Sequence, residues 1–275
     1  MPHAPSPFSV LIGCGAALAI AFAAWRKGSL SGSGAVAAAI GGALSMLAGL
    51  PWGVFLVVWF LYASLLSRAG RDAKAARTGE IIAKGGRRDA WQVLANGGVY
   101  FALAAWTVGT ALGAPGDPLD PAVLAAAALV AAGADTTATE VGTWWRGASV
   151  SVRTWQQVPA GTSGAVSLMG SLAMVAAAVV LAGVAVTAGL ISSRALWVVA
   201  AAGVVGAVID TLLGATLQAR RICRRCGKAT EQRVHRCGGE TGLTGGLSWM
   251  DNDMVNALCT LAAAGVAALL SVMPG

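Results

Sequence analysis

Eight long runs of apolar residues, almost free of charge, limit what this chain can fold into. The runs cover residues 8–25, 34–50, 51–67, 90–112, 121–134, 164–190, 195–218 and 254–273. An α-helix needs roughly 17–25 apolar residues to cross a hydrocarbon core about 30 Å thick. We therefore predict an all-α fold, a polytopic integral membrane helix bundle with about eight transmembrane helices in one domain, residues 1–275.

The number of spans is seven or eight, because three of the runs are short. Residues 34–50 and 51–67 meet at Pro51, and they form either a tight hairpin or two segments that do not fully cross. The run 121–134 is also short, so we expect its helix to continue into 135–140. The 37 glycines allow close helix approach, which lipid-embedded helices need because apolar solvent gives no hydrophobic drive for association.

The composition excludes other classes of protein. The chain is 56% hydrophobic and only 11% charged, against roughly 25% charged residues in soluble domains. A disordered chain would be polar and charged, which this one is not. Five cysteines are too few for a secreted disulfide framework. The net charge of +7 does not indicate nucleic-acid binding, because there is no soluble domain to carry a basic face.

Lysine and arginine predict the orientation in the membrane, because they accumulate in cytoplasmic loops. With eight spans, 18 of the 19 basic residues fall in alternate connections, and only Arg194 lies on the other side. These connections are residues 26–33, 68–89, 135–163 and 219–253. We therefore predict that both termini are outside, that these four loops are cytoplasmic, and that the protein lies in the cell membrane.

A basic, glycine-rich segment precedes the fourth apolar run and predicts phosphate binding. Its candidate ligands are Lys84, Arg87, Arg88, Gln92 and Asn96. Glycines let the backbone approach a phosphate while cations neutralise it, and residues four apart share a helix face. The Walker A spacing is absent. The alternative is a positively charged flank before a capped helix.

Acidic residues stand at the cytoplasmic ends of three spans, where carboxylates and hydroxyls are typical ligands of Mg²⁺. The candidate magnesium ligands are Asp135, Glu140, Asp210, Asp251 and Asp253. Ordinary capping explains a polar helix end, and the helix dipole alone accounts for acids at the start of the last span. Neither explains Asp210, which lies inside the seventh run and needs a cation or a hydrogen-bonding partner.

Two further segments add phosphate-binding candidates. The turn Gly161, Thr162, Ser163 leads into the sixth span, where backbone N–H groups and hydroxyls suit a phosphate. Arg153 lies just before it and predicts a bidentate phosphate contact. Asn256 lies one turn after Asp253. A simple capped turn is the alternative for the 161–163 segment.

The last cytoplasmic loop carries a cluster of soft metal ligands. Cys223, Cys226, His235 and Cys237 follow the pattern C-x2-C-x8-H-x-C. Two tight pairs of such ligands in a reducing compartment predict a structural zinc site. A reactive dithiol or free structural cysteines are the alternatives.

Five ordered motifs, taken together, resemble one integral membrane family across residues 30 to 270. They are Gly86-Arg87-Arg88-Asp89 with Gln92 to Gly97, Ala134-Asp135-Thr136 with Glu140-Val141-Gly142, Gly161 to Gly164 with Val166-Ser167, Asp210 with Leu213-Gly214-Ala215 and Gln218, and Asp251-Asn252-Asp253 with Val255-Asn256. The family contains the plant phytyl-phosphate kinase of the vitamin E pathway and the animal transmembrane protein 19.

The resemblance implies a membrane kinase that makes an isoprenyl diphosphate. The donor would be a nucleoside triphosphate, with CTP favoured, and the acceptor a phytyl- or geranylgeranyl-type isoprenyl monophosphate. Mg²⁺ would be the catalytic cofactor, with Asp135, Glu140, Asp210 and Asp253 as the catalytic acids. This agrees with the motifs themselves, since metal, cations and positioning are what phosphoryl transfer requires. A lipid-phosphate carrier without chemistry and a nucleotidyl transferase remain the alternatives.

Overall fold

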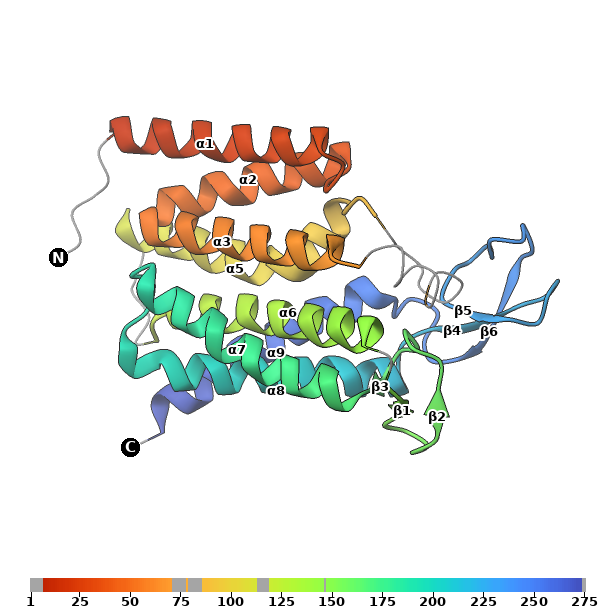
Figure 1. Cartoon of the computed structure of the whole chain (residues 1–275). Coiled ribbons are helices and arrows are strands. Elements are labelled where there is room, and N and C mark those ends of the chain that lie inside the picture. The colour runs from red at the N-terminus through yellow and green to blue at the C-terminus, as the bar shows by residue number, and fades with distance from the viewer. Residues whose placement is uncertain (1–6, 71–77, 79–85, 113–118, 146, 274–275) are drawn as a thin grey trace.

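The structure, a computed structural model, describes residues 7–70, 78, 86–112, 119–145 and 147–273. Within these ranges eight α-helices form a bundle with two small sheets at one end (Figure 1). The helices are α1 (Pro7–Arg26), α2 (Gly32–Ala48), α3 (Leu50–Arg68), α5 (Ala90–Ala111), α6 (Pro121–Trp144), α7 (Leu168–Thr187), α8 (Leu196–Thr216) and α9 (Asn252–Val272). A short 3₁₀ helix, η1 (Ser193–Ala195), precedes α8.

Six of the described helices, α3 and α5 to α9, are long and apolar enough to cross a membrane. The first two are shorter as apolar helices, with 17 residues in α2. Apart from α6, which ends ten residues beyond the run 121–134, the helices match the apolar runs to within a few residues, and α3 does begin at the break around Pro51. A polytopic helical membrane fold is thus confirmed.

Two three-stranded antiparallel sheets correct the all-α prediction. One has the order β2-β1-β3 and the other β5-β4-β6. Their strands are β1 (Ser149–Ser151), β2 (Gln157–Val158), β3 (Ala165–Val166), β4 (Arg220–Cys223), β5 (Ala229–Thr230) and β6 (Thr241–Gly245). Strands this short leave too few residues for an alternating apolar pattern, so periodicity could not reveal them.

The α6 helix continues beyond its apolar run, as expected, and passes residue 140 to end at Trp144, so Asp135 and Glu140 lie on a regular helix. At its other end Asp120 caps the helix by accepting a hydrogen bond from the Ala122 N–H at 2.9 Å. A helix of 24 residues spans about 36 Å at 1.5 Å per residue, enough to carry its last turns out of the hydrocarbon core.

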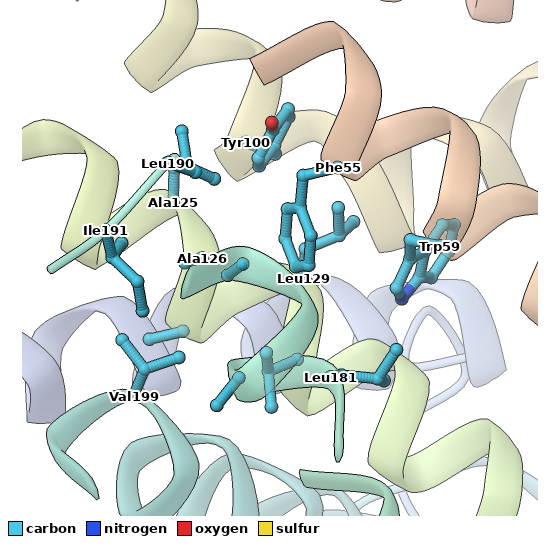
Figure 2. Close-up of a cluster of buried hydrophobic side chains, with 14 of the residues drawn as sticks. Phe55, Trp59, Tyr100, Ala125, Ala126, Leu129, Leu181, Leu190, Ile191 and Val199 are labelled. Carbon is cyan, nitrogen blue, oxygen red and sulfur yellow. The ribbon is translucent and has the colours of Figure 1, made fainter. Parts of the chain in front are cut away.

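The core of the bundle is built around α6, which contacts α3, α5, α7, α8 and α9. Most of its residues from 125 to 134 are alanines, and all of those alanines are buried. Larger side chains from neighbouring helices, including Phe55, Leu181 and Val199, fill the space around it (Figure 2). Tyr100 joins this cluster and donates its hydroxyl to the Trp52 carbonyl at 2.6 Å, which satisfies a buried polar group.

The two ends of the bundle differ in character. The start of α1 and the end of α9 lie at one end, and both sheets lie at the other (Figure 1). The basic connections meet at the sheet end: the Arg88 N–H donates to the Ser29 carbonyl at 3.0 Å, and Arg68 Nη2 donates to Ser29 Oγ at 2.7 Å. The functional groups gathered at this end are therefore separated from the termini by the length of the helices.

A glycine contact tests this packing. A Cβ atom added at Gly206 on α8 would lie 2.8 Å from the Ala131 Cβ and 2.9 Å from the Ala263 Cβ, where three helices meet. We expect Gly206→Leu to destabilise the protein by about 1–3 kcal/mol because the core cannot accept the added volume. Gly265→Leu, whose added Cβ meets nothing within 4 Å, is the control. Thermal unfolding in detergent measures both, and an equal midpoint for the two variants would contradict this packing.

Candidate functional site

A single large cavity of about 1330 Å³ contains most of the predicted site residues. It is lined at the sheet end by polar side chains from α5, α6, α8 and α9 and from both sheet-bearing loops. Its lining continues with apolar residues of α1, α2 and α3. The cavity therefore joins a polar chamber to an apolar channel inside the bundle.

The centre of the polar chamber is a pair of carboxylates on neighbouring helices. Asp135 lies one turn after Ala131 on α6, and Asp210 lies one turn after Gly206 on α8. Since Gly206 and Ala131 bring the two helices into contact, the next turn brings the two carboxyl groups together. Asp210 Oδ1 is buried and has no hydrogen-bond partner among the described residues. Two adjacent carboxylates with an unsatisfied buried oxygen fit a divalent cation.

The other three predicted magnesium ligands line the same cavity but are spread around it. Glu140 lies further along α6 and acts electrostatically on Arg88. Asp251 caps α9 and accepts a hydrogen bond from the Met254 N–H at 3.1 Å. Asp253 follows in the first turn of α9. Of the five acids, the structure brings Asp135 and Asp210 into direct proximity.

The predicted cations are divided between the cavity and other surroundings. Arg88 lines the cavity and donates from Nη2 to Ser67 Oγ at 3.2 Å. Burial lowers the pKa of its guanidinium, and the negative charge of Glu140 opposes that shift. Arginine stays protonated in proteins. Hydrogen bonds to α3 hold the Arg88 guanidinium beside the cavity, where it can bind an anion.

Arg87 and Arg153 are not among the residues that line the cavity. The Arg87 guanidinium instead packs against Gly28, which lies in the short connection between α1 and α2. Arg153 is exposed in the β1–β2 connection. The pKa of Arg220 is lowered mainly by the burial of Arg220 and also by the positive charge of Arg153. Lys84 lies outside the described residues.

The predicted amide side chains all line the cavity. Gln92 forms a capping box with Asp89 at the start of α5, in which its Oε1 accepts from the Asp89 N–H at 3.1 Å. Asn96 stands one turn later and donates Nδ2 to the Gln92 carbonyl at 2.9 Å. Asn256 faces the same cavity from α9. The capping box therefore fixes the helix start that presents both α5 amides.

The predicted glycine turn, residues 161–163, also lines the cavity. The following residue, Gly164, has φ +72° and approaches α8 so closely that an added Cβ would lie 2.4 Å from the Ala215 Cα. This contact holds the turn against the end of α8. Ser163 Oγ donates a hydrogen bond to Glu231, which ties the turn to the second sheet-bearing loop.

Several cavity residues were not predicted from the sequence as site residues. They include Arg221, Glu231, Gln232, Arg233 and Arg236, and also Gln218, which was identified from the sequence only as part of a motif. Glu231 accepts a hydrogen bond from Gln218 Nε2 at 2.9 Å in addition to the one from Ser163. The sequence did offer one signal for Glu231, since it is an acid within an otherwise basic, cysteine-containing loop. That this loop returns to the cavity is seen only once the hairpin is folded.

The apolar part of the cavity follows α3 along the bundle. Its lining includes Ile20, Met46, Gly53, Val57 and Phe60. From Gly53 to Ser64, where the lining becomes polar, α3 rises about 16 Å at 1.5 Å per residue. At the far end the Met46 thioether lies against Gly53, where an added Cβ would be 1.9 Å from the sulfur. The channel therefore offers an elongated apolar surface to a hydrocarbon tail.

The four predicted zinc ligands also converge, outside the membrane-spanning helices. One ligand atom from each of Cys223, Cys226, His235 and Cys237 lies within 4.8 Å of the other three. Backbone N–H groups of Cys226 and Arg225 together with neighbouring thiols lower the pKa of Cys223 to about 7, against the opposing effect of burial. None of the four is a lining residue of the cavity.

Comparisons with known proteins identify the family. Residues 15–264 match the family described as integral membrane protein DUF92. Protein PGR of Arabidopsis thaliana is 28% identical over 273 residues, which cover 92% of this chain and 93% of that protein. Uncharacterized membrane protein sll0875 of Synechocystis is 33% identical over 173 residues, 62% of this chain and 66% of that protein. No solved structure shows a significant match. The family resemblance drawn from the ordered motifs is thus confirmed, and the chain belongs to the DUF92 integral membrane proteins.

Proposed function

We propose that this protein is a membrane-embedded, Mg²⁺-dependent isoprenyl monophosphate kinase that uses a nucleoside triphosphate, with CTP favoured. The observation that carries the proposal is the single cavity that is lined by the paired Asp135 and Asp210 carboxylates, by other polar side chains and by the apolar residues of the channel. A phosphate group on a long hydrocarbon tail has the same two-part character. The family resemblance described above favours the same chemistry.

The apolar channel supports a lipid acceptor. It runs among α1, α2 and α3, and its walls carry small or flexible residues such as Ala38, Gly42 and Met46. A phytyl- or geranylgeranyl-type tail would lie along it, with its phosphate at the end where Ser64, Ser67 and Arg88 line the cavity. Burial of such a tail contributes binding free energy at about 0.8 kcal/mol per CH₂ group relative to water.

The polar chamber supports a nucleotide and its metal. Asp135 and Asp210 would hold Mg²⁺, and Glu140, Asp251 and Asp253 line the same cavity. When bound, Mg²⁺ supplies positive charge that offsets the phosphate oxygens. The glycine turn at residues 161–163 would present backbone N–H groups to the same oxygens.

The reaction needs positioning more than acid–base catalysis. An oxygen of the isoprenyl phosphate attacks the γ-phosphorus of the donor, and the bond to the β-phosphate oxygen breaks to release the nucleoside diphosphate. The acceptor is already ionised at neutral pH, so no strong base is required. Arg88, Gln92 and Asn96 would hold the two phosphate groups in line.

We place this end of the bundle in the cytoplasm and the protein in the cell membrane. The support is the distribution of charge, because 18 of the 19 lysines and arginines fall in the four alternate connections. Nucleoside triphosphates are on that side, and the proposed lipid acceptor would enter from the bilayer.

The first prediction concerns the carboxylate pair. We expect Asp210→Asn to lower kcat at least 100-fold, because it removes one of the two charges that would hold the metal. Asp120→Asn makes the same chemical change at the far end of α6, where asparagine is an equally good helix cap, and should keep full activity. The measurement is product analysis with phytyl or geranylgeranyl monophosphate, Mg²⁺ and each of CTP, ATP, GTP and UTP.

The identity of the product separates the proposal from its alternatives. Isoprenyl diphosphate formed by the wild type and lost in Asp210→Asn supports the kinase. A nucleotide-linked lipid would instead indicate a nucleotidyl transferase. Binding of the lipid phosphate with no nucleotide consumed would contradict any enzyme on these substrates and favour a carrier.

The second prediction concerns the channel. Val57 lines it, whereas its neighbour Val58 is not a lining residue and is 38% exposed on the outside of α3. We expect Val57→Phe to raise KM for geranylgeranyl phosphate about 10-fold, with a smaller effect for the shorter geranyl phosphate, because the ring shortens the channel. Val58→Phe should leave both KM values unchanged. An equal effect of both variants on both lipids would show that the tail binds elsewhere.

A further inference from the structure

The loop between α8 and α9 is folded around a compact group of three thiols and one imidazole. The Cys223 and Cys237 sulfurs are 3.5 Å apart, those of Cys226 and Cys237 are 3.7 Å apart, and Cys226 Sγ lies 3.4 Å from His235 Nδ1. The four ligands come from two short segments that are separated by the β5 strand. Cys223 is the last residue of β4, and the other three ligands lie in the connections of the second sheet, outside the helices.

These separations are those of a tetrahedral metal site. With Zn–S of about 2.3 Å and Zn–N of about 2.0 Å, a tetrahedron places its sulfurs about 3.8 Å apart and sulfur about 3.5 Å from nitrogen. His235 presents Nδ1 to the cluster, 3.4 Å from Cys226 Sγ, so Nδ1 is the ring nitrogen that would bind the metal. We propose that Cys223, Cys226, His235 and Cys237 bind one structural Zn²⁺.

The backbone around the cluster is shaped for metal binding. Cys223 to Gly227 forms a turn closed by a hydrogen bond from the Gly227 N–H to the Cys223 carbonyl at 2.9 Å. The second turn is closed in the same way, from the Gly238 N–H to the His235 carbonyl at 2.8 Å. Both glycines have φ above +70°, a conformation that other residues adopt at a cost. Each turn presents its two ligands to one point.

A third glycine lets the chain pass over the sulfurs. A Cβ atom at Gly239 would lie 2.9 Å from Cys223 Sγ and 3.4 Å from Cys237 Sγ. The side of the cluster at Gly239 is therefore closed by backbone alone. A closed four-ligand site without an open position is characteristic of structural zinc, whereas catalytic zinc keeps one position for water.

A disulfide explains these contacts less well. It would join two of the three sulfurs at about 2.05 Å and leave the third thiol and the imidazole unused. All five cysteines of the described chain are free thiols, and Cys237 has contacts of similar length to two partners. Because the Cys237 sulfur lies at similar distances from both other sulfurs, one ion at the centre of the cluster explains the contacts better than a disulfide.

The zinc would have a defined structural task. The segment between the two ligand pairs carries Glu231, which accepts hydrogen bonds from Ser163 and from Gln218 at the edge of the cavity. Strands of two to five residues give this segment little stability of their own. Metal binding would hold the hairpin, and with it Glu231, against the 161–163 turn. This inference does not depend on the proposed kinase activity.

Metal analysis of the purified full chain tests the site. We expect about one zinc per chain for the wild type and for the control variant Cys14→Ser, whose thiol lies in α1. Cys237→Ser should retain less than a fifth of that amount. Replacement of zinc by Co²⁺ in the wild type should give the thiolate charge-transfer and visible d–d absorption of tetrahedral Co²⁺. A wild type that contains no zinc, does not bind Co²⁺ or holds a disulfide within the cluster would overturn the proposal.

Limited trypsin digestion tests the structural task independently of activity and of protein yield. Arg224, Arg225 and Arg233 are exposed on the hairpin, so loosening the hairpin should speed cleavage there. We expect chelation of zinc from the wild type to raise the cleavage rate at these arginines at least tenfold, and added Zn²⁺ to restore protection. The Cys237→Ser variant should be cleaved quickly with or without zinc. Equal cleavage of the zinc-loaded and chelated protein would show that the metal does not hold the hairpin.

Discussion

The close packing of α6 against α8 is the contact on which the rest of the structure depends. Lipid offers no hydrophobic drive between helices, so contact requires small residues that let backbones approach. Gly203 and Gly206 supply this on α8, against Val130 and Ala131 of α6. One turn further along, the same close approach of α6 and α8 brings the Asp135 and Asp210 carboxylates together inside a membrane protein. Packing and chemistry are therefore set by the same pair of helices.

Around this pair the bundle separates two environments. The outer helices, α1 to α3, leave an apolar channel along their length, and the two sheets close the opposite end with basic, amide and hydroxyl side chains. A charged group inside the channel would be poorly solvated, and a hydrocarbon tail among the arginines would gain little. We therefore propose that the cavity orients an amphipathic lipid phosphate with its phosphate beside the carboxylates, as the proposed transfer between two phosphates would need.

The sequence predicted the helices well because each is a continuous apolar run whose length is set by the bilayer. The Lys and Arg distribution put Asp135, Asp210, Gln92 and Asn96 at one end of the bundle, and all four line the same cavity. The sheets were missed, because strands of a few residues leave no periodic pattern. Arg87 and Arg153 were predicted to bind phosphate, but neither lines the cavity, because loop conformation, which the spacing does not encode, sets the position of their side chains. Glu231 was missed for the same reason, since it reaches the cavity only through a folded hairpin.

The central claim is that the Asp135 and Asp210 pair holds a divalent cation at the junction of the two environments. Its most direct test is Mn²⁺ binding followed by electron paramagnetic resonance, on the wild type and on Asp135→Asn and Asp210→Asn, with nucleotide present and with Asp120→Asn as the control. We predict one site in the wild type and in the control that either cavity variant weakens at least tenfold. Equal Mn²⁺ binding by all four proteins would show that the pair is not a metal site and would contradict the account.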